Sequence, residues 1–585
     1  MKVLLTTLNA KFVHTSLALW YLYQSCRDTG VALSLREFNI NQDLNWICGE
    51  IYLERADAIA FSCNIWNIEP NLKIIRRLKA VASETAIILG GPEVSTAPIR
   101  ILEEYPEVDF IVAGEGEITF REWLLELAQP HPAWPQIAGL TYRRAGIPVS
   151  NEPHPPIKDL SIVPFPYPED LAPFRQKMVY YESSRGCPNH CQYCLSANEH
   201  GVRFFPLDRV KEELARFAAA GIGQVKFVDR TFNCHPGRAR EIWRFLIELA
   251  RRSPVNTNFH FEIMGEQLDP ESLDLLAEAP PGLFQFEIGV QSTHPETLDL
   301  IQRRMDFNKL REQVARLISA RKVFVHLDLI AGLPAEDYPT FGKTFDDNLV
   351  LEPDRLQLGF LKLLKGSGLR NRAAEFGYRF TAEPPYEVMA NHWLSYAELL
   401  RLKLIEDLLE RYYNSGWFRL SLPFVISGFA TPFAFFESFA AWWKERGYDQ
   451  CSHKTKDLYE YLLHFDQEIA GRTPQLLAAL LKYDLLSRER LVELPEWAGP
   501  PDPELRQLGY QFWLEPQRRE QFIPELAGLA PRDISRRVLF VRFPCDPAAY
   551  ARGLESPAPP PEVVESTLYL FIYLDNNKVR IMRVE

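Results

Sequence analysis

The sequence predicts an α/β protein: a doubly wound, Rossmann-like domain, then a partial barrel of six β/α units, then a mostly helical α+β region. Three observations lead to this fold class. Short apolar runs alternate with amphipathic stretches at the start of the chain, the same alternation resumes after a proline-rich stretch, and it stops near residue 383. We therefore expect domains at residues 1–150, 178–382 and 383–585, with a stiff, proline-rich linker over residues 151–177.

Composition is that of an ordinary multidomain protein. With 585 residues, the chain exceeds what one hydrophobic core usually serves. The sequence contains no run of about 20 apolar residues, which is the length that a membrane span requires. A net charge of −12 disfavours nucleic acid as the main partner, because phosphate binding requires a basic surface. Nine cysteines, three of them clustered, favour a reducing cytoplasm and a metal site over a disulfide framework.

The first domain is expected to hold a parallel sheet. Apolar runs at residues 3–6, 58–62, 86–89 and 110–113 are predicted strands, with helices over 16–26 and 71–82. Two glycine-rich turns, GGPE from Gly90 and GEGE from Gly114, follow the last two runs. Ligands of such sheets bind at the carboxyl ends of strands, where glycine lets the backbone approach closely. The turns lack the Gly-x-Gly-x-x-Gly spacing, so NAD is not supported.

The second domain repeats a strand–helix unit. Expected strands cover residues 178–182, 224–228, 258–263, 284–290, 323–330 and 355–360, and expected helices cover 206–220, 236–252, 270–277, 295–303 and 338–349. Six units are too few for a closed eight-unit barrel, which leaves an open side for a large substrate.

The third domain departs from this pattern. Helices are expected over residues 386–413, 432–446, 456–465 and 474–486, and late strands over 537–541 and 567–573, with a linker at 555–561. No chemical motif is evident there.

Three cysteines follow the first strand of the partial barrel: Cys187, Cys191 and Cys194, in a Cys-x3-Cys-x2-Cys pattern. Thiolates favour iron–sulfur clusters and zinc. Three of them can hold three corners of a four-iron cluster and leave the fourth iron open, as a catalytic metal site requires. The alternative is a zinc site with His190 or a distant residue as fourth ligand. The sequence has no second Cys-x2-Cys pair to complete a four-thiolate zinc site, which counts against this alternative.

This cysteine loop resembles that of the radical S-adenosylmethionine (SAM) enzymes, whose open iron binds SAM and whose cluster cleaves it to a 5′-deoxyadenosyl radical. With the two glycine-rich turns ahead of it, the chain resembles B12 (cobalamin)-binding radical SAM proteins that carry a C-terminal domain of unknown function, in the magnesium-protoporphyrin ester cyclase-like branch. The resemblance implies a [4Fe-4S] cluster, SAM and cobalamin as cofactors. The Asp-x-His-x-x-Gly loop that ligates cobalt is absent, so cobalamin is expected without a histidine ligand.

For cobalamin, the resemblance implies contacts from two strand ends and the two turns, namely Asn9, Ser62, Gly90, Gly91, Pro92, Glu93, Gly114, Glu115 and Gly116. The alternative is a Rossmann-like domain that has kept the fold and lost the cofactor.

For SAM, candidate contacts lie at the ends of the predicted strands. Asp229 suits the SAM ammonium, and Arg230 suits its carboxylate or the substrate. Glu262 ends the third strand, and Glu287 precedes Gln291 and Ser292 in a segment that resembles the GVQS segment bordering the ribose and methionyl parts of SAM. Asp328 and Ile330 share one face of the fifth strand, in a segment that resembles the DxIxGLP motif around the adenine.

The leading hypothesis is an enzyme that abstracts hydrogen from an unactivated carbon of a small molecule and then transfers methyl from methylcobalamin. Cobalamin-assisted cyclisation or rearrangement is the first alternative, and a non-catalytic, cluster-binding sensor or scaffold is the second. The leading hypothesis implies an external reductant such as flavodoxin or ferredoxin.

Overall fold

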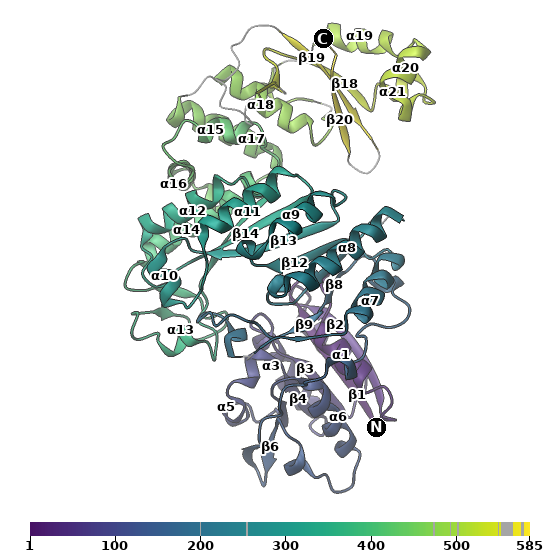
Figure 1. The fold of residues 1–585 in the computed structure, drawn as a ribbon, viewed down its shortest axis with the longest axis vertical. Helices are drawn as coiled ribbons and strands as arrows, with labels where there is room; N and C mark the ends of the chain where they lie inside the picture. The colour runs from purple at the N-terminus through teal and green to yellow at the C-terminus, as the bar shows by residue number, and fades with distance from the viewer. Residues whose placement is uncertain are drawn as a thin grey trace. The chain divides into compact units, whose positions relative to one another are not determined.

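The computed structural model describes residues 1–198, 201–252, 256–471, 474–491, 493–499, 502–547, 549–550, 566–574 and 578–584 (Figure 1). The linker expected at 555–561 lies outside these residues. The chain forms two compact units: Met1–Thr344, Leu351–Pro353 and Leu358–Leu399 make the first, and Phe345–Val350, Asp354–Gln357 and Leu400–Glu585 the second.

A seven-stranded sheet opens the first unit. Its strands are β1 (Lys2–Asn9), β2 (Ala32–Asn39), β3 (Ala58–Ser62), β4 (Ala86–Gly90), β5 (Phe110–Val112), β6 (Leu140–Arg144) and β7 (Ile147–Ser150), in the order β2-β1-β3-β4-β5-β6-β7. Strands β1 to β5 run parallel, and β6 and β7 add an antiparallel edge. The doubly wound fold class is therefore confirmed.

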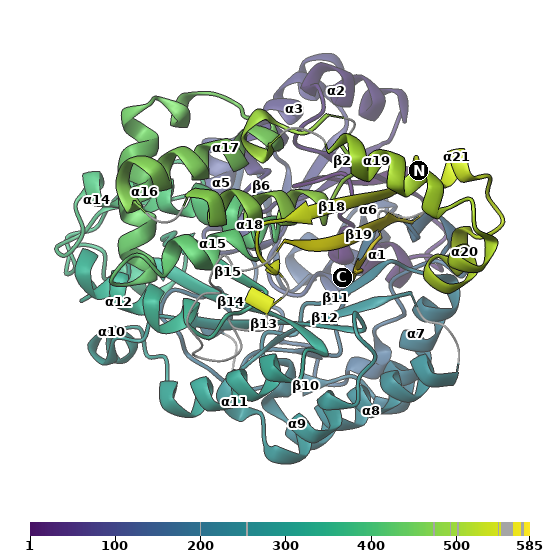
Figure 2. The ribbon, with the colours of Figure 1, turned by 90° about the horizontal axis from the view of Figure 1, so that it is seen from above.

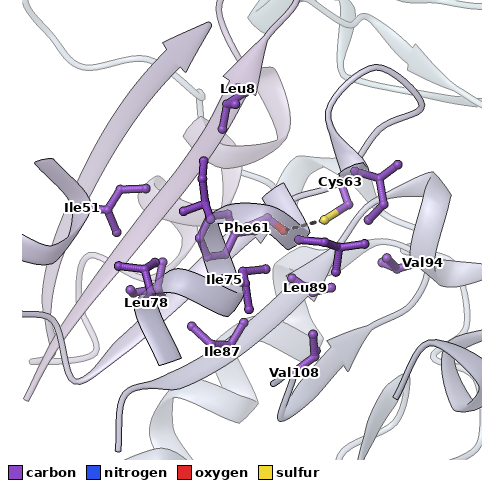
Figure 3. Close-up of a cluster of buried hydrophobic side chains, with 14 of the residues drawn as sticks. Leu8, Ile51, Phe61, Cys63, Ile75, Leu78, Ile87, Leu89, Val94 and Val108 are labelled. Carbon is purple, nitrogen blue, oxygen red and sulfur yellow. Dashed lines mark hydrogen bonds between the residues drawn. The ribbon is translucent and has the colours of Figure 1, made fainter. Parts of the chain in front are cut away.

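Alternate residues of this sheet enter two separate cores. Leu4, Phe61 and Leu89 pack on one face with helices α2 (Leu44–Leu53) and α3 (Ile68–Val81), and Figure 3 shows this cluster. Val3 and Ile88 point to the opposite face, where α1 (Leu17–Ser25) and α6 (Gly116–Leu127) cover them. Both faces are buried, which explains why the strands are continuous apolar runs.

The edge strands of this sheet were not predicted. Strand β2 has the sequence ALSLREFN and is only half-buried along most of its length, so it lacks the apolar run that marked its neighbours. The β6–β7 hairpin turns at Ala145 and Gly146, both with positive φ, as a two-residue hairpin turn requires. Ala145 is an unusual residue at positive φ, so the sequence carries no clear signal for this turn.

The partial barrel has six strands, as predicted. They are β8 (Met178–Tyr181), β11 (Gln224–Phe227), β12 (Asn258–Ile263), β13 (Phe284–Gln291), β14 (Val323–Ala331) and β15 (Arg355–Phe360), ordered β15-β14-β13-β12-β11-β8. Strands β8 to β14 run parallel. Helices α7 (Leu207–Ala220), α8 (Pro236–Arg252), α9 (Pro270–Ala277) and α11 (Phe307–Ser319) lie along the outside of the sheet (Figure 2).

Two predicted helices differ from the structure. The helix expected over 295–303 ends at Leu300 as α10 (Pro295–Leu300), and α11 then begins after Asp306, whose side chain accepts a hydrogen bond from Lys309 N. The helix expected from 386 begins instead as α14 (Tyr396–Leu408). Ser395 and Glu398 form a capping box there, and residues 388–390 form the short strand β17 (Val388–Ala390) beside β16 (Arg379–Phe380).

The second unit combines helices with a small sheet. Its helices include α15 (Ser421–Ile426), α16 (Pro432–Glu445), α17 (Thr455–Phe465) and α18 (Pro474–Leu486). Strands β18 (Val538–Phe543), β19 (Thr567–Tyr573) and β20 (Val579–Arg583) form an antiparallel sheet. Trp513 and Leu570 belong to its core. Among the described helices of the whole chain, none has the length and apolar content needed to span a membrane.

Candidate functional site

The cysteine loop leaves the carboxyl end of β8 and is closed by a short antiparallel pair, β9 (Ser184–Arg185) with β10 (Arg203–Phe204). Cys187 and Cys191 are buried and Cys194 is half-buried. The backbone N–H of Cys194 donates to the Cys191 carbonyl at 3.0 Å, which forms a tight turn. Gly186 has φ +95°, and a Cβ there would lie 2.1 Å from the Gly201 carbonyl oxygen, so the loop requires glycine.

A cleft of about 780 Å³, partly open to solvent, adjoins this loop. We call it the cysteine cleft. It is lined by Cys187, Asn189, Cys191, Tyr193, Cys194, Ala197, Arg230, Thr231, Glu262, Ile263, Met264, Glu287, Gly289, Gln291, Arg303 and Asp328. The carboxyl ends of parallel strands meet at one edge of the sheet, which explains how residues far apart in sequence gather around one loop.

Five of the eight residues predicted to bind SAM line this cleft together with the three cysteines: Arg230, Glu262, Glu287, Gln291 and Asp328. Gln291 has φ +74°, an uncommon conformation for a residue other than glycine, next to a register shift between β13 and β14. Ile330 shares a face with Asp328, since both are half-buried while Leu329 and Ala331 between and beyond them are buried, but it is not among the lining residues.

Asp229 lies outside the cleft lining. It is 1% exposed, and its carboxylate accepts hydrogen bonds from the Ser183 backbone N–H at 2.8 Å and from the hydroxyls of Ser183 and Ser184 at 2.7 and 2.6 Å. Burial raises the pKa of Asp229, and the serine donors oppose that rise. The side chain therefore fixes the start of the cysteine loop, and a direct contact with SAM stays a prediction.

Ser292 also lies outside the lining. It is fully buried, and its hydroxyl donates to Glu336 Oε1 at 2.6 Å. Thr344 Oγ1 donates to the same oxygen at 2.7 Å. Burial raises the pKa of Glu336 to about 7. Ser292 thus joins a buried hydrogen-bonded group behind the end of β13.

Arg303 is the main cleft residue that the sequence did not reveal. One guanidinium nitrogen lies 3.8 Å from Cys191 Sγ and 3.4 Å from the Tyr193 hydroxyl, and another donates to the Gly289 carbonyl. It follows α10 and not a strand, so the strand-end rule does not find it. Asn189, Tyr193, Thr231 and Met264 were also missed; only their nearness to the cysteines or to a strand end marked them.

Charged side chains from the neighbouring strands β11, β12 and β13 contact one another on one face of the sheet. Lys226 Nζ lies 2.8 Å from Glu287 Oε2 and 3.8 Å from Glu262 Oε1. His260 Nε2 lies 3.0 Å from the same Glu287 oxygen. Burial disfavours the charge of Glu287, but His260 and Lys226 outweigh it and hold its pKa below the ordinary value. Burial and the nearby Glu287 raise the pKa of Glu262 to about 7.

The thiols and the polar side chains of the lining have the chemistry to hold a cluster and a polar ligand. In the described part of the chain, no three His, Cys, Asp or Glu side chains converge as ligands of one metal ion must. A four-iron cluster spreads its thiolates around a larger core. Gln291 Oε1 and Arg303 Nε are buried without a hydrogen-bond partner among the described residues, so a polar ligand in the cleft would satisfy both.

The residues predicted for cobalamin lie at the carboxyl edge of the first sheet. Gly90 ends β4, Pro92 begins the short helix α4 (Pro92–Ser95), and Gly116 begins α6. Gly114 has φ +85°, and a Cβ there would meet no atom within 4 Å, which leaves open space beside the turn. Phe12 and Trp66, in the loops after β1 and β3, are 68% and 46% exposed. Exposed rings and open backbone suit a large, flat ligand.

Four of the predicted cobalamin residues already have protein partners. Asn9 Nδ2 donates to the His14 carbonyl and to Glu37, both at 3.1 Å. The Ser62 carbonyl accepts from Asn67 and Asn71. The carboxylates of Glu93 and Glu115 contact residues of the half of the unit that carries the cysteine loop. A contact between any of these four residues and cobalamin stays a prediction.

The fold and the site define an α/β protein with a ligand-binding first sheet and a cysteine-bearing partial barrel. Three family models match the chain: "B12 binding domain" over residues 3–124, "Radical SAM superfamily" over 181–347, and "Protein of unknown function (DUF4080)" over 374–557. The chain therefore carries, in this order, a region that matches the B12-binding model, a region that matches the radical SAM model and a region that matches the DUF4080 model.

Curated relatives share part of this arrangement. The chain is 31% identical over 203 residues to the 2-(S-pantetheinyl)-carbapenam-3-carboxylate methyltransferase of Streptantibioticus cattleyicolor, which covers 33% of this chain and 30% of the relative. It is 29% identical over 218 residues to the cobalamin-dependent radical SAM methyltransferase TokK of Streptomyces tokunonensis, covering 35% and 32%. The matches thus span about a third of these relatives.

Solved structures agree at the level of the fold. The methyltransferase TsrM from Kitasatospora setae, with cobalamin and a [4Fe-4S] cluster bound, superposes with a TM-score of 0.55 over 66% of this chain and 82% of TsrM, at 18% identity. The enzyme OxsB, with aqua-cobalamin and SAM bound, gives 0.58 over 83% of this chain and 78% of OxsB, at 14% identity.

Proposed function

We propose that this protein is a cobalamin-dependent radical SAM methyltransferase acting on a small molecule. The observation that carries the proposal is the cysteine cleft, where three thiols lie beside Arg303 and beside the strand-end residues Glu262, Gln291 and Asp328. When bound, the cluster and SAM supply a 5′-deoxyadenosyl radical that abstracts hydrogen from an unactivated carbon, and methylcobalamin supplies the methyl group. The two curated relatives described above are both named methyltransferases, and this supports the reaction class.

Each lining residue has a role that its chemistry suits. Cys187, Cys191 and Cys194 hold the cluster. Arg303, a cation beside Cys191 with a free Nε, pairs with the SAM carboxylate, and Glu262 accepts from the SAM ammonium. Gln291 and Asp328 supply acceptors for the ribose hydroxyls, and Ile330 borders the adenine.

The remaining charged residues shape the cleft. Arg230 and Glu287 face the same space as the SAM contacts and are proposed to orient the substrate. Asp229 and Ser292 hold the loop and the strand end from outside the cleft. We assign residues 1–150 to cobalamin, 178–382 to cluster and SAM, and 383–585 to a separate C-terminal domain, with a flavodoxin or ferredoxin as electron donor. A cytoplasmic location stays a prediction.

Cyclisation is the second candidate. The anaerobic magnesium-protoporphyrin IX monomethyl ester cyclase of Synechocystis is 32% identical over 113 residues, which cover 18% of this chain and 22% of that protein. Products separate the two reactions. Methyl transfer forms S-adenosylhomocysteine beside 5′-deoxyadenosine, whereas cyclisation forms 5′-deoxyadenosine alone.

The test uses the full chain, reconstituted anaerobically with iron, sulfide, hydroxocobalamin and SAM. The wild type should carry four irons and a corrinoid per chain and should cleave SAM once reduced. Cys187→Ala, Cys191→Ala and Cys194→Ala should each lose the cluster and SAM cleavage, because an iron corner loses its ligand. Cys234→Ala and His190→Ala are controls and should keep the iron. One zinc per chain that is lost in His190→Ala, or an intact cluster that never cleaves SAM, would refute the proposal.

A further inference from the structure

Each glycine-rich turn carries a glutamate, Glu93 in the first and Glu115 in the second, whose carboxylate contacts the half of the first unit that carries the cysteine loop. Glu93, which lies in α4, is 5% exposed. The Tyr386 hydroxyl donates to Glu93 Oε2 at 2.8 Å, and Lys365 Nζ lies 3.4 Å from the same oxygen. A buried carboxylate needs such partners, because an unpaired buried charge is costly. Glu93 is thus held by residues that follow the partial barrel.

Tyr386 is itself held firmly. Its side chain is 1% exposed, and the Arg370 guanidinium lies 4.6 Å from its ring centroid. Its φ is +58°, a left-handed conformation that a residue other than glycine adopts only when the surrounding contacts enforce it. The backbone around it pairs with the chain after β15, since Leu363 N donates to the Tyr386 carbonyl at 3.0 Å.

Residues 365–370, which include Lys365 and Arg370, also contact the middle of the cysteine loop. Leu369 N donates to the Gln192 carbonyl at 2.8 Å, and Asn198 Nδ2 donates to the Gly366 carbonyl at 3.1 Å. A Cβ at Gly368 would lie 2.0 Å from Gln192 Oε1, so this backbone lies close to the Gln192 side chain. Thr96, just after α4, donates to the Lys365 carbonyl at 3.4 Å. Residues 365–370 therefore bridge the first turn and the cysteine loop.

The second turn contacts the two ends of the cysteine loop. Arg203 Nη2 donates to Glu115 Oε1 at 2.5 Å, and Arg185 donates to Glu117. Arg185 and Arg203 are paired across β9 and β10, the strands that close the loop. Burial disfavours the charge of Glu115, but the Arg203 guanidinium and the Ile157 N–H outweigh it and lower its pKa.

We propose that Tyr386 and Arg203 are positioning residues: through Glu93 and Glu115 they fix the two glycine-rich turns against the cysteine loop and so set the distance between corrinoid and cluster. This inference rests on the proposed function, since it needs both cofactors. In this inference the carboxylates of Glu93 and Glu115 contact other protein residues and not the corrinoid. The corrinoid is then bound by the backbone of the two turns. Group transfer between bound partners is sensitive to displacements of about 1 Å, so contacts that hold the two cofactor sites at a fixed distance favour the reaction.

The test is the double variant Y386F/E115Q of the full chain, which removes the hydrogen bond from Tyr386 to Glu93 and the negative charge that Glu115 presents to Arg203, and which keeps the side-chain shapes. The matched control is Y378F/E126Q. Tyr378 donates to the Gly332 carbonyl at 3.0 Å, and Glu126 accepts from Ala133 N at 2.7 Å, so neither touches the cysteine loop. Iron and corrinoid contents are measured first. The magnetic interaction between reduced cluster and cob(II)alamin is then measured by electron paramagnetic relaxation.

We expect Y386F/E115Q to keep both cofactors and to show a second, slowly relaxing cob(II)alamin population, which the wild type and the control lack. Each lost hydrogen bond to a charged group should raise the undocked fraction about 10- to 100-fold. Unchanged relaxation with both cofactors present would overturn the inference. Loss of corrinoid or of iron in the double variant would also overturn it, because these residues would then bind a cofactor themselves. A wild type without either cofactor would instead refute the proposed function.

Discussion

Replacing Gly91 by alanine should destabilise the first sheet more than the same replacement at Gly114 or Gly49. Gly91 has φ +112° and ψ 172°, a backbone region that is essentially restricted to glycine. A Cβ there would also lie 2.4 Å from the Cys63 carbonyl oxygen and 3.1 Å from its nitrogen. Both obstacles are backbone atoms of the chain just after β3, so they cannot rotate away.

The two effects can be estimated separately. The unfavourable backbone conformation costs about 1–3 kcal/mol, and moving the packed backbone costs about 1–3 kcal/mol more, so Gly91→Ala should destabilise this sheet by about 2–6 kcal/mol. Gly114→Ala is the matched control: its φ is +85°, but a Cβ would meet nothing within 4 Å, and the cost should be only about 1–2 kcal/mol. Gly49→Ala, inside α2 and also open, should stabilise by about 0.5–1 kcal/mol.

Native-state hydrogen exchange measures these differences in the sheet itself, because β3 and β4 are buried strands whose amides report its opening free energy. Peptides that cover residues 58–62 and 86–90 should show the lowest protection in Gly91→Ala. Protection should be higher in Gly114→Ala, higher again in the wild type, and highest in Gly49→Ala. Protection equal in Gly91→Ala and Gly114→Ala, within about 0.5 kcal/mol, would show that the approach to Cys63 does not constrain position 91.

Two carboxylates near the cysteine cleft should respond to substitution and to pH. Asp229→Asn replaces one of the two carboxylate oxygens that accept from Ser183 and Ser184 by an amide nitrogen, which cannot accept, so exchange protection of residues 183–194 should fall by about 2–4 kcal/mol. Asp159→Asn, at an exposed cap that accepts from Ser161 N, should change little, and equal effects would contradict this account. Because the pKa of Glu262 is raised from 4.5 to about 7, its carboxyl is uncharged below that pH and ionises above it; its contribution to stability is therefore present at low pH and lost as pH rises from about 4.5 to 7. SAM affinity of the reconstituted protein should strengthen from pH 6 to 8 by calorimetry, and Glu262→Gln should flatten the profile; a flat wild-type profile would argue against a contact between Glu262 and the ammonium.

The sequence by itself determined the interior strands and, through them, most of the cleft. Short apolar runs that alternate with amphipathic stretches indicate strands of a parallel sheet whose two faces are both covered. Because carboxyl ends gather at one edge, Arg230 and Glu262 were placed by their position at strand ends, whereas Asp328 was placed by the resemblance of its segment to the DxIxGLP motif. The Cys-x3-Cys-x2-Cys spacing could be recognised from the sequence without knowledge of the structure.

Only the tertiary structure decided what each polar side chain touches. Asp229 sits at a strand end like Glu262, yet it turns away from the cleft to the serines of a neighbouring strand end. Arg303 reaches Cys191 from a helix end that carries no sequence mark. Glu93 meets Tyr386 across 293 residues of chain. Local pattern reports the period of an element, whereas these partners depend on side-chain direction and on long-range packing, which no local pattern encodes.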